Sequence, residues 1–266
     1  MLQLNYQSLV AAPNIRPLPI GRRVVLDLLA MYGEPAVTAR LFYDIDMTWA
    51  NKLTESFAAK DIRVTPTALL IKAISMAQIE HPISRSVLIP GERLFTFDNI
   101  TGGFTVEKFV DNDPIVLFGE IATPHERSVV DITKELKEYH DAEIDSIPYL
   151  KQQYDFAHLP FFIRRTIMWL GTVFPSFRLR YVRSTFGLTS LGSLGTTVVS
   201  APPVSTSVFG IGAIENRMVQ DGEEQLVKPM MTVSLNFDHR VMDGGQAARF
   251  FLDVKKLMEE GWDEAV

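Results

Sequence analysis

Near the C-terminus, an alternating strand pattern leads directly into a charged turn and then into a helix pattern. Residues 231–237 (MTVSLNF) alternate between apolar and polar side chains, which is typical of a β-strand. Residues 246–260 have helical spacing, and Gly244 and Gly245 precede them. The chain must therefore turn sharply from a strand into a helix at this point. The ionisable residues of the turn are Asp238, His239, Arg240 and Asp243.

His239 is the candidate general base of this turn. A general base needs an imidazole on a rigid element, a group that fixes its orientation, and open backbone where the substrate approaches. A histidine at a strand end is more often structural or merely exposed. An ordinary strand-to-helix turn, however, does not need four ionisable groups within six residues, so the crowding favours catalysis here. The other histidines lie in plain helical or loop contexts: His81, His125, His140 and His158.

The composition excludes several classes of function. An apolar fraction of 47% and a charged fraction of 22% are typical of a globular protein with a sizeable core, and no stretch reads as a linker. We therefore expect a single domain over residues 1–266. The net charge of −6 argues against a nucleic-acid partner. The absence of cysteine excludes disulfides, thiolate metal sites and cysteine nucleophiles, and we expect no metal.

The N-terminal sequence predicts the compartment. It lacks the basic start and long apolar run of a signal peptide. The chain has no uncharged apolar stretch of about 18 residues, the length that spans a bilayer. We therefore expect a cytoplasmic protein.

Patterns elsewhere predict helices and strands without regular β-α-β alternation. Thr65 and Pro66 form a helix start signal, an N-cap followed by proline in the first turn. Turns are expected at Gly102–Gly103 and at residues 111–113. The mixture indicates an α+β fold, a two-layer sandwich in which helices cover a mixed sheet. We expect helices at 21–31, 48–60, 65–80, 131–140 and 246–260, and strands at 37–45, within 94–121, and at 186–191, 205–214 and 226–237.

The C-terminal sequence resembles a known catalytic motif. DHRVMDG followed by GQAARFFLDVKKLMEE (residues 238–260) is similar to the catalytic motif of the dihydrolipoamide acyltransferases of 2-oxo acid dehydrogenase complexes. The catalytic domains of that family share the chloramphenicol acetyltransferase-like fold. The resemblance covers nearly the whole chain and is strongest in its last 85 residues. Further matches in the same order are residues 16–23 (RPLPIGRR), 41–48 (LFYDIDMT), 184–192 (STFGLTSLG) and 201–203 (APP).

The resemblance implies acyl transfer between a coenzyme A thioester and a nucleophile, in the family the thiol of a lipoyl group. His239 would take the proton from the attacking group, because an imidazole titrates near neutral pH. Thr189 occupies the family's hydroxyl position for stabilising the oxyanion, with Ser190 as the alternative donor. Asp243 would act structurally by pairing with an arginine, for which Arg22 is the candidate. Ser190 and Arg183 are the candidate contacts to coenzyme A.

The resemblance also implies a homotrimer whose active site lies between subunits, with His239 from one subunit and Thr189 from its neighbour. Trimers of the family also form larger cubic cores. The chain shows no lipoyl or peripheral-subunit-binding domain, so a lipoyl group must come from a partner protein, or the acceptor is a different small molecule. Two alternatives remain open: a non-catalytic trimeric scaffold related to these complexes, and an enzyme that works at a membrane surface on long acyl chains.

Residues 144–184 form an atypical insertion, aromatic and arginine-rich, in which we expect two helices divided near Gly171 and Pro175. The sequence contains no acidic residue from Phe156 to Ile214. Such a segment could hold coenzyme A phosphates, cover an apolar acyl chain or lie on a membrane. We favour packing, with an apolar helix face buried and the arginines extending to water. That buried face would comprise Phe161, Phe162, Ile163, Ile167, Met168, Trp169 and Leu170; the arginines are Arg164, Arg165, Arg178, Arg180 and Arg183.

Overall fold

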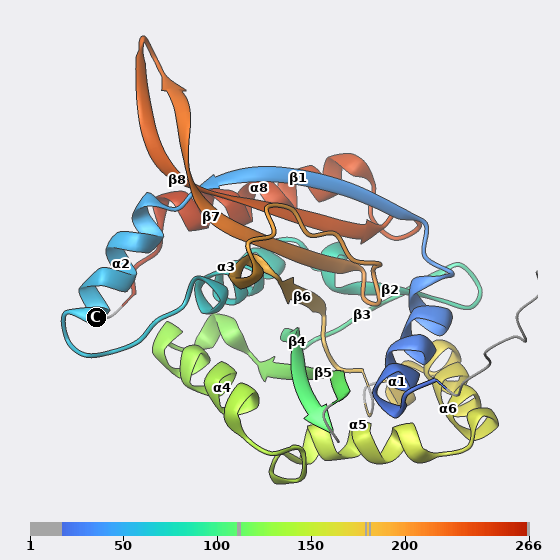
Figure 1. Ribbon diagram of the computed structural model, residues 1–266. Helices are drawn as coiled ribbons and strands as arrows, with labels where there is room; N and C mark the ends of the chain where they lie inside the picture. The colour runs from blue at the N-terminus through green and yellow to red at the C-terminus, as the bar shows by residue number, and fades with distance from the viewer. Residues whose placement is uncertain (1–17, 111–112, 179, 181, 265–266) are drawn as a thin grey trace, which may run out of the picture.

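A mixed six-stranded sheet runs through the computed structural model, which describes residues 18–110, 113–178, 180 and 182–264 (Figure 1). The strand order is β1-β8-β7-β6-β4-β5. β6 is parallel to both of its neighbours, and the other neighbouring pairs are antiparallel. The strands are β1 (Thr38–Asp46), β4 (Thr101–Val110), β5 (Asp113–Ala122), β6 (Phe186–Ser190), β7 (Ser207–Asp221) and β8 (Glu224–Asp238), and β2 (Ser86–Ile89) pairs with β3 (Arg93–Thr96) in a small separate sheet.

Helices accompany the sheet, which confirms the expected α+β class. The helix start predicted at Thr65 is confirmed, because its hydroxyl accepts a hydrogen bond from the N–H of Ala68 at 3.3 Å. The helices are α1 (Ile20–Leu28), which continues as a π-helical turn (Leu29–Gly33), α2 (Thr48–Ala58), α3 (Pro66–Glu80), α4 (Val129–Asp141), α5 (Pro148–His158), α6 (Phe161–Val173), α7 (Pro175–Arg178) and α8 (Gly244–Glu260). Short 3-10 turns lie at Pro82–Arg85, Pro124–Glu126, Ile144–Ser146 and Gly192–Leu194.

The main core lies between the sheet and the helices α3 and α8. Phe250 and Phe251 of α8 are fully buried, and both rings make edge contacts with Phe209 of β7. Phe186 and Leu188 of β6 belong to the same core. Because successive side chains of a strand point to opposite faces, Gly187 and Thr189 face away from this core.

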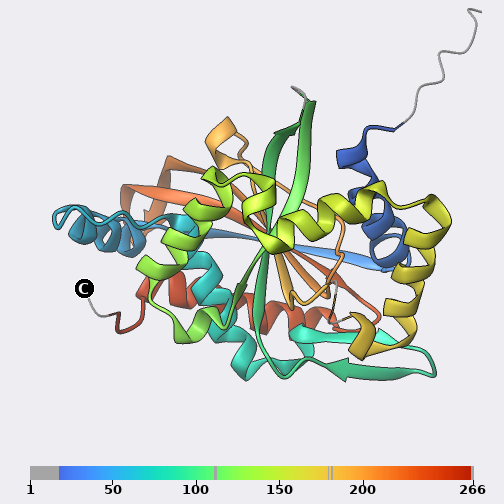
Figure 2. The same cartoon turned by 90° about the horizontal axis from the view of Figure 1, so that it is seen from below.

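The helices α1, α5 and α6 form a second, smaller core on the opposite side of β6. In Figure 1, α1 and α6 lie beside one end of the sheet and α5 runs below it, and Figure 2 shows α5 from below with both helices at its end. The buried residues that hold the three helices together are Val24, Leu28, Tyr32, Phe156, Ala157, Met168 and Val182.

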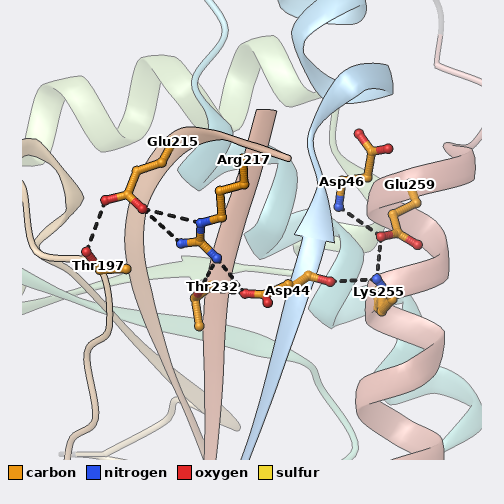
Figure 3. Close-up of polar contacts among 8 residues, drawn as sticks. All are labelled: Asp44, Asp46, Thr197, Glu215, Arg217, Thr232, Lys255 and Glu259. Carbon is orange, nitrogen blue, oxygen red and sulfur yellow. Dashed lines mark hydrogen bonds and ion pairs between the residues drawn. The ribbon is translucent and has the colours of Figure 1, made fainter. Parts of the chain in front are cut away.

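A polar network fixes the hairpin of β7 and β8 where it leaves the body of the molecule (Figures 1 and 3). Arg217 pairs with Asp44 of β1 at 2.8 Å and with Glu215 at 3.1 Å. Lys255 of α8 donates to the Asp44 carbonyl at 2.6 Å, and Glu259 accepts from the Asp46 N–H at 2.8 Å. β1, the hairpin and α8 are thus joined at this end of the sheet, which sets the direction of α8.

One predicted turn is wrong. Gly102 and Gly103 lie inside β4 rather than in a turn, because side chains from neighbouring elements approach their backbone: a Cβ on Gly102 would lie 2.8 Å from the Phe186 ring, and one on Gly103 would lie 2.7 Å from Ser184. The division predicted near Gly171 and Pro175 is confirmed, because α6 ends at Val173 and α7 begins at Pro175. The segment has a further break that was not predicted, between α5 and α6 before Phe161.

The expected packing of α6 is confirmed at Met168 and partly at Ile167, but it is wrong for most of the predicted face. Phe162 is 80% exposed and Trp169 is 53% exposed, whereas Arg164 is buried. Arg164 donates to Asp27 of α1 at 2.6 Å, and Arg165 lies 3.1 Å from the other oxygen of that fully buried carboxylate. A buried carboxylate needs charged partners, and this need determines which face of α6 turns inward.

Some expectations lie outside the described residues. Arg16 and Pro17 of the basic N-terminal motif are among them, as are Asp111 and Asn112 of a predicted turn. Within the described part of the chain, no helix is both long and apolar enough to cross a membrane.

Candidate functional site

His239 is exposed immediately after the last residue of β8. Its backbone N–H donates to the Val37 carbonyl at 2.7 Å, which ties the turn to the start of β1. Its ring lies 5.7 Å from the Phe237 ring, centre to centre. Within the described residues of one chain, neither ring nitrogen makes a hydrogen bond, so the imidazole is available to an outside group.

Two local interactions make the turn rigid. Asp238, which is nearly buried, accepts hydrogen bonds from the Arg240 guanidinium at 2.9 and 2.6 Å and from the Arg240 N–H at 3.0 Å. Asp243 caps α8: its carboxylate accepts from the N–H of Gln246 at 2.7 Å, and the Gln246 side chain accepts from the Asp243 N–H at 3.0 Å. This capping box fixes the direction in which α8 leaves the turn.

Arg22 does not pair with Asp243 within the described residues of a single chain. Asp243 is the N-cap of α8, whereas Arg22 is exposed on α1 and lines a cavity between α1 and the sheet. The structural role expected for Asp243 has a physical basis in the helix cap. An ion pair with Arg22 could form only with a different copy of the chain.

Thr189 lies on the cavity side of β6. It lines the same cavity as Arg22, and its hydroxyl accepts a long hydrogen bond, 3.4 Å, from Thr105 of β4. Ser190, the next residue, is exposed and does not line the cavity. Of the two candidate hydroxyl donors, Thr189 is therefore the one that a ligand in this cavity would meet.

His239 and Thr189 are far apart within one chain. In the register of the sheet, Thr189 of β6 pairs with Gly210 of β7, and Gly210 pairs with Ser234 of β8. His239 is five residues beyond Ser234, about 17 Å along the strand, and two strand spacings add about 10 Å across the sheet. The two Cα atoms are thus about 20 Å apart, whereas a base and an oxyanion donor must each lie about 3 Å from the reacting atoms.

Arg183 is already bound to a carboxylate. Its guanidinium forms an ion pair with Glu120 of β5, with one hydrogen bond of 3.1 Å, and lies 5.2 Å from the centre of the Tyr149 ring. Burial raises the pKa of the Glu120 carboxyl, and Arg183 partly opposes that rise. A phosphate of coenzyme A would have to compete with Glu120 for this arginine.

Thr105 is the site residue that sequence reasoning missed. It is a single threonine in an ordinary strand, 84 residues from Thr189, and the two meet only through the pairing of β4 with β6. No local pattern carries this signal. Among the described residues, no group of three or more acidic or histidine side chains could hold a metal ion.

Sequence comparison finds a family match in the C-terminal third of the chain. Residues 180–264 match the family "2-oxoacid dehydrogenases acyltransferase (catalytic domain)". The acetyltransferase component of the acetoin cleaving system of Bacillus subtilis is 41% identical over 80 residues, 29% of this chain and 20% of the relative. The lipoamide acyltransferase component of the branched-chain alpha-keto acid dehydrogenase complex of Pseudomonas putida is 42% identical over 80 residues, 29% of this chain and 19% of that protein. The match thus spans about a fifth of each relative.

Structure comparison covers almost the whole chain. A probable dihydrolipoamide acetyltransferase from Listeria monocytogenes matches with a TM-score of 0.68 at 18% identity, over 97% of this chain and 99% of that one. A chloramphenicol acetyltransferase matches with a TM-score of 0.53 at 12% identity, over 92% and 99% of the two chains. The chloramphenicol acetyltransferase-like fold expected from the sequence is confirmed.

Proposed function

We propose that this chain, whose residues 180–264 match the 2-oxoacid dehydrogenases acyltransferase catalytic domain, transfers an acyl group between coenzyme A and a thiol or another small acceptor. One observation carries the proposal. An exposed imidazole without a hydrogen bond stands at the end of a buried strand, and a capped helix and an internal ion pair hold its turn. General-base catalysis needs this arrangement.

The chemistry follows from the two candidate side chains. His239 removes the proton of the acceptor thiol, and the thiolate attacks the thioester carbonyl carbon. The hydroxyl of Thr189 donates a hydrogen bond to the resulting oxyanion. When the intermediate collapses, the carbon–sulfur bond to coenzyme A breaks, and the protonated His239 returns its proton to the departing thiolate. His239 and Thr189 thereby regain their initial states, and the next cycle can begin.

We infer that the working site forms between two copies of the chain. The separation of about 20 Å between His239 and Thr189 excludes their joint action within one copy. A closed ring of identical subunits would bring His239 of each copy to Thr189 of the next. A homotrimer fits this requirement, and larger cubic assemblies and lipoyl-carrying partners remain part of the proposal.

Steady-state kinetics with acetyl-coenzyme A and dihydrolipoamide tests the proposal. His239→Ala should lower kcat by about 10²- to 10⁴-fold, the usual contribution of a positioned general base. His140→Ala is the matched control, since His140 is an exposed histidine at the end of α4. Equal activity of both variants would contradict the role of His239.

A binding measurement separates the enzyme from the scaffold alternative. An acyltransferase should gain thermal stability when coenzyme A is added, because a ligand that binds only the folded state stabilises it. If millimolar coenzyme A causes no shift and no acyl donor is turned over, the chain is a scaffold that shares the fold.

A further inference from the structure

A cavity of about 370 Å³ lies between the sheet and the helices α1, α5 and α6. Apolar side chains make up most of its wall. α1 contributes Val24, Val25 and Leu28, β5 contributes Val116, and the basic segment contributes Phe156 and Met168. The atypical segment, residues 144–184, therefore forms part of the wall of this cavity.

The cavity is too large and too apolar to be a packing defect. Its volume equals about a dozen groups of water size at ~30 Å³ each. The cavity is partly open to solvent, and most of the surface that it presents to water is apolar. An apolar ligand suits the space better than solvent.

The candidate catalytic hydroxyl opens onto the cavity. Gly187 and Thr189 lie on the same face of β6, and both line the cavity. Gly187 has no side chain, and a Cβ at this position would lie 3.3 Å from Val208 and 3.8 Å from Ser205. Because Thr189 borders the apolar space, a group that accepts a hydrogen bond from its hydroxyl can extend its remaining atoms into that space.

A single cation stands at the wall of the cavity. Among the described residues that line it, Arg22 is the one charged side chain. Arg22 is exposed, and its guanidinium forms no ion pair with a described residue of the same chain. An apolar space with one free cation suits an amphiphile that has an aliphatic chain and an anionic group.

We propose that the cavity binds an unbranched aliphatic chain of about ten carbons, carried by either the acyl donor or the acceptor. The inference rests on the proposed function for its orientation, which places the reacting carbonyl at Thr189. The cavity then makes the enzyme selective for medium-length chains rather than acetyl groups.

A chain-length series with a matched pair of variants tests this. Val25 and Leu26 are neighbours on α1, but Val25 lines the cavity and Leu26 is 45% exposed outside its wall. We measure kcat/KM for acetyl-, hexanoyl- and decanoyl-coenzyme A in the wild type, in Val25→Trp and in Leu26→Trp. Each buried methylene should raise kcat/KM by about fourfold, so decanoyl, with eight more methylenes than acetyl, should exceed acetyl by about 10³-fold or more. Val25→Trp should reduce that ratio at least tenfold, and Leu26→Trp should preserve it.

A second arm identifies the source of the chain. Acetyl-coenzyme A is held constant while the acceptor is varied from ethanethiol to decanethiol. A preference for decanethiol that Val25→Trp removes assigns the chain to the acceptor. The same preference in the donor series assigns it to the acyl group. Either result supports the cavity as a chain-binding site.

Direct binding of decanoate, measured by isothermal titration calorimetry, separates the two proposals. Binding that Val25→Trp abolishes, without turnover of any donor, supports the cavity site and contradicts acyl transfer. Acetyl transfer without chain-length preference in either series, and without decanoate binding, overturns the cavity site and leaves acyl transfer standing. Folding of both variants is checked by circular dichroism, and Gly187→Leu, which fills the cavity from the sheet side, provides an independent second obstruction.

Discussion

The C-terminal region from β6 to α8 and the basic segment from α5 to α7 are both rich in apolar side chains, yet they bury them in opposite ways. In α8 the periodic apolar residues, including Phe250 and Phe251, are fully buried against the sheet. In α6, Phe161, Phe162 and Trp169 face outward while Arg164 is buried. A periodic hydrophobic pattern predicts the buried face of a helix correctly when the helix packs against a large apolar surface. The prediction fails when the helix must instead place a cation beside a buried carboxylate.

The largest expected effect concerns the buried charges of the basic segment. Asp27→Ala should destabilise the protein by about 3–5 kcal/mol, because it leaves Arg164 buried without its carboxylate. Urea unfolding monitored by circular dichroism measures the loss. The double variant Asp27→Leu/Arg164→Met should recover most of the stability, since a buried ion pair is often replaceable by apolar residues. A small loss in the single variant would show that water reaches this site.

A pair of phenylalanine truncations tests the contrast directly. Phe250→Ala should cost about 3–5 kcal/mol, the usual range for a buried phenylalanine. Phe162→Ala should change stability by no more than about 0.5 kcal/mol, because the side chain is 80% exposed. Both values come from the same unfolding measurement. Similar losses in the two variants would mean that another copy or a partner covers α6.

A smaller effect is expected at the start of α8. Asp243→Ala removes the N-cap and should cost about 1 kcal/mol. Asp243→Asn retains a capping side chain and should cost less, which makes it the control. If His239 depends on this cap for its position, kcat should fall more in the alanine variant than in the asparagine variant.

The smallest expected effect concerns how the stability of the protein depends on pH. Burial tends to raise the pKa of Glu264, but hydrogen bonds from Lys72, Trp262 and the Val129 N–H outweigh it and hold that pKa below its ordinary value. A lowered pKa in the folded state contributes stability above the ordinary pKa of about 4.3, and that contribution is lost as the pH falls through the folded value. Between about pH 6 and pH 3, the melting temperature of Glu264→Gln should therefore fall less than that of the wild type. Parallel curves would contradict this role for Glu264.

Short sequence patterns predicted the elements that neighbouring residues define. Thr65 and Pro66 mark the start of α3, and the strand-turn-helix around His239 forms as expected. The turn predicted at Gly102 and Gly103 was wrong because glycine also occurs where a neighbouring side chain packs against the backbone. Here those side chains are Phe186 and Ser184. Contacts across long sequence separations carry no local signal.

The candidate site shows the same division. The position of His239 at a strand end followed from its neighbours in sequence. The cavity that Thr189 lines depends on α1, α5 and α6, and the partner of Arg164 lies 137 residues away. The distance between His239 and Thr189 follows only from the register of three strands. Sequence therefore predicted the local setting of His239 better than the long-range arrangement of the candidate residues.

The central claim is that His239 of one copy works with Thr189 of another, and subunit mixing tests it most directly. His239→Ala and Thr189→Ala are each purified, shown to be inactive, then unfolded together and refolded as mixed oligomers. If subunits combine at random in a closed ring, about one site in four receives an intact His239 and an intact Thr189, and about a quarter of wild-type activity should return. Mixing His239→Ala with the His239→Ala/Thr189→Ala double variant should return none. If the two single variants also remain inactive after mixing, while wild type refolds with full activity, the site is not shared between copies and the account is wrong.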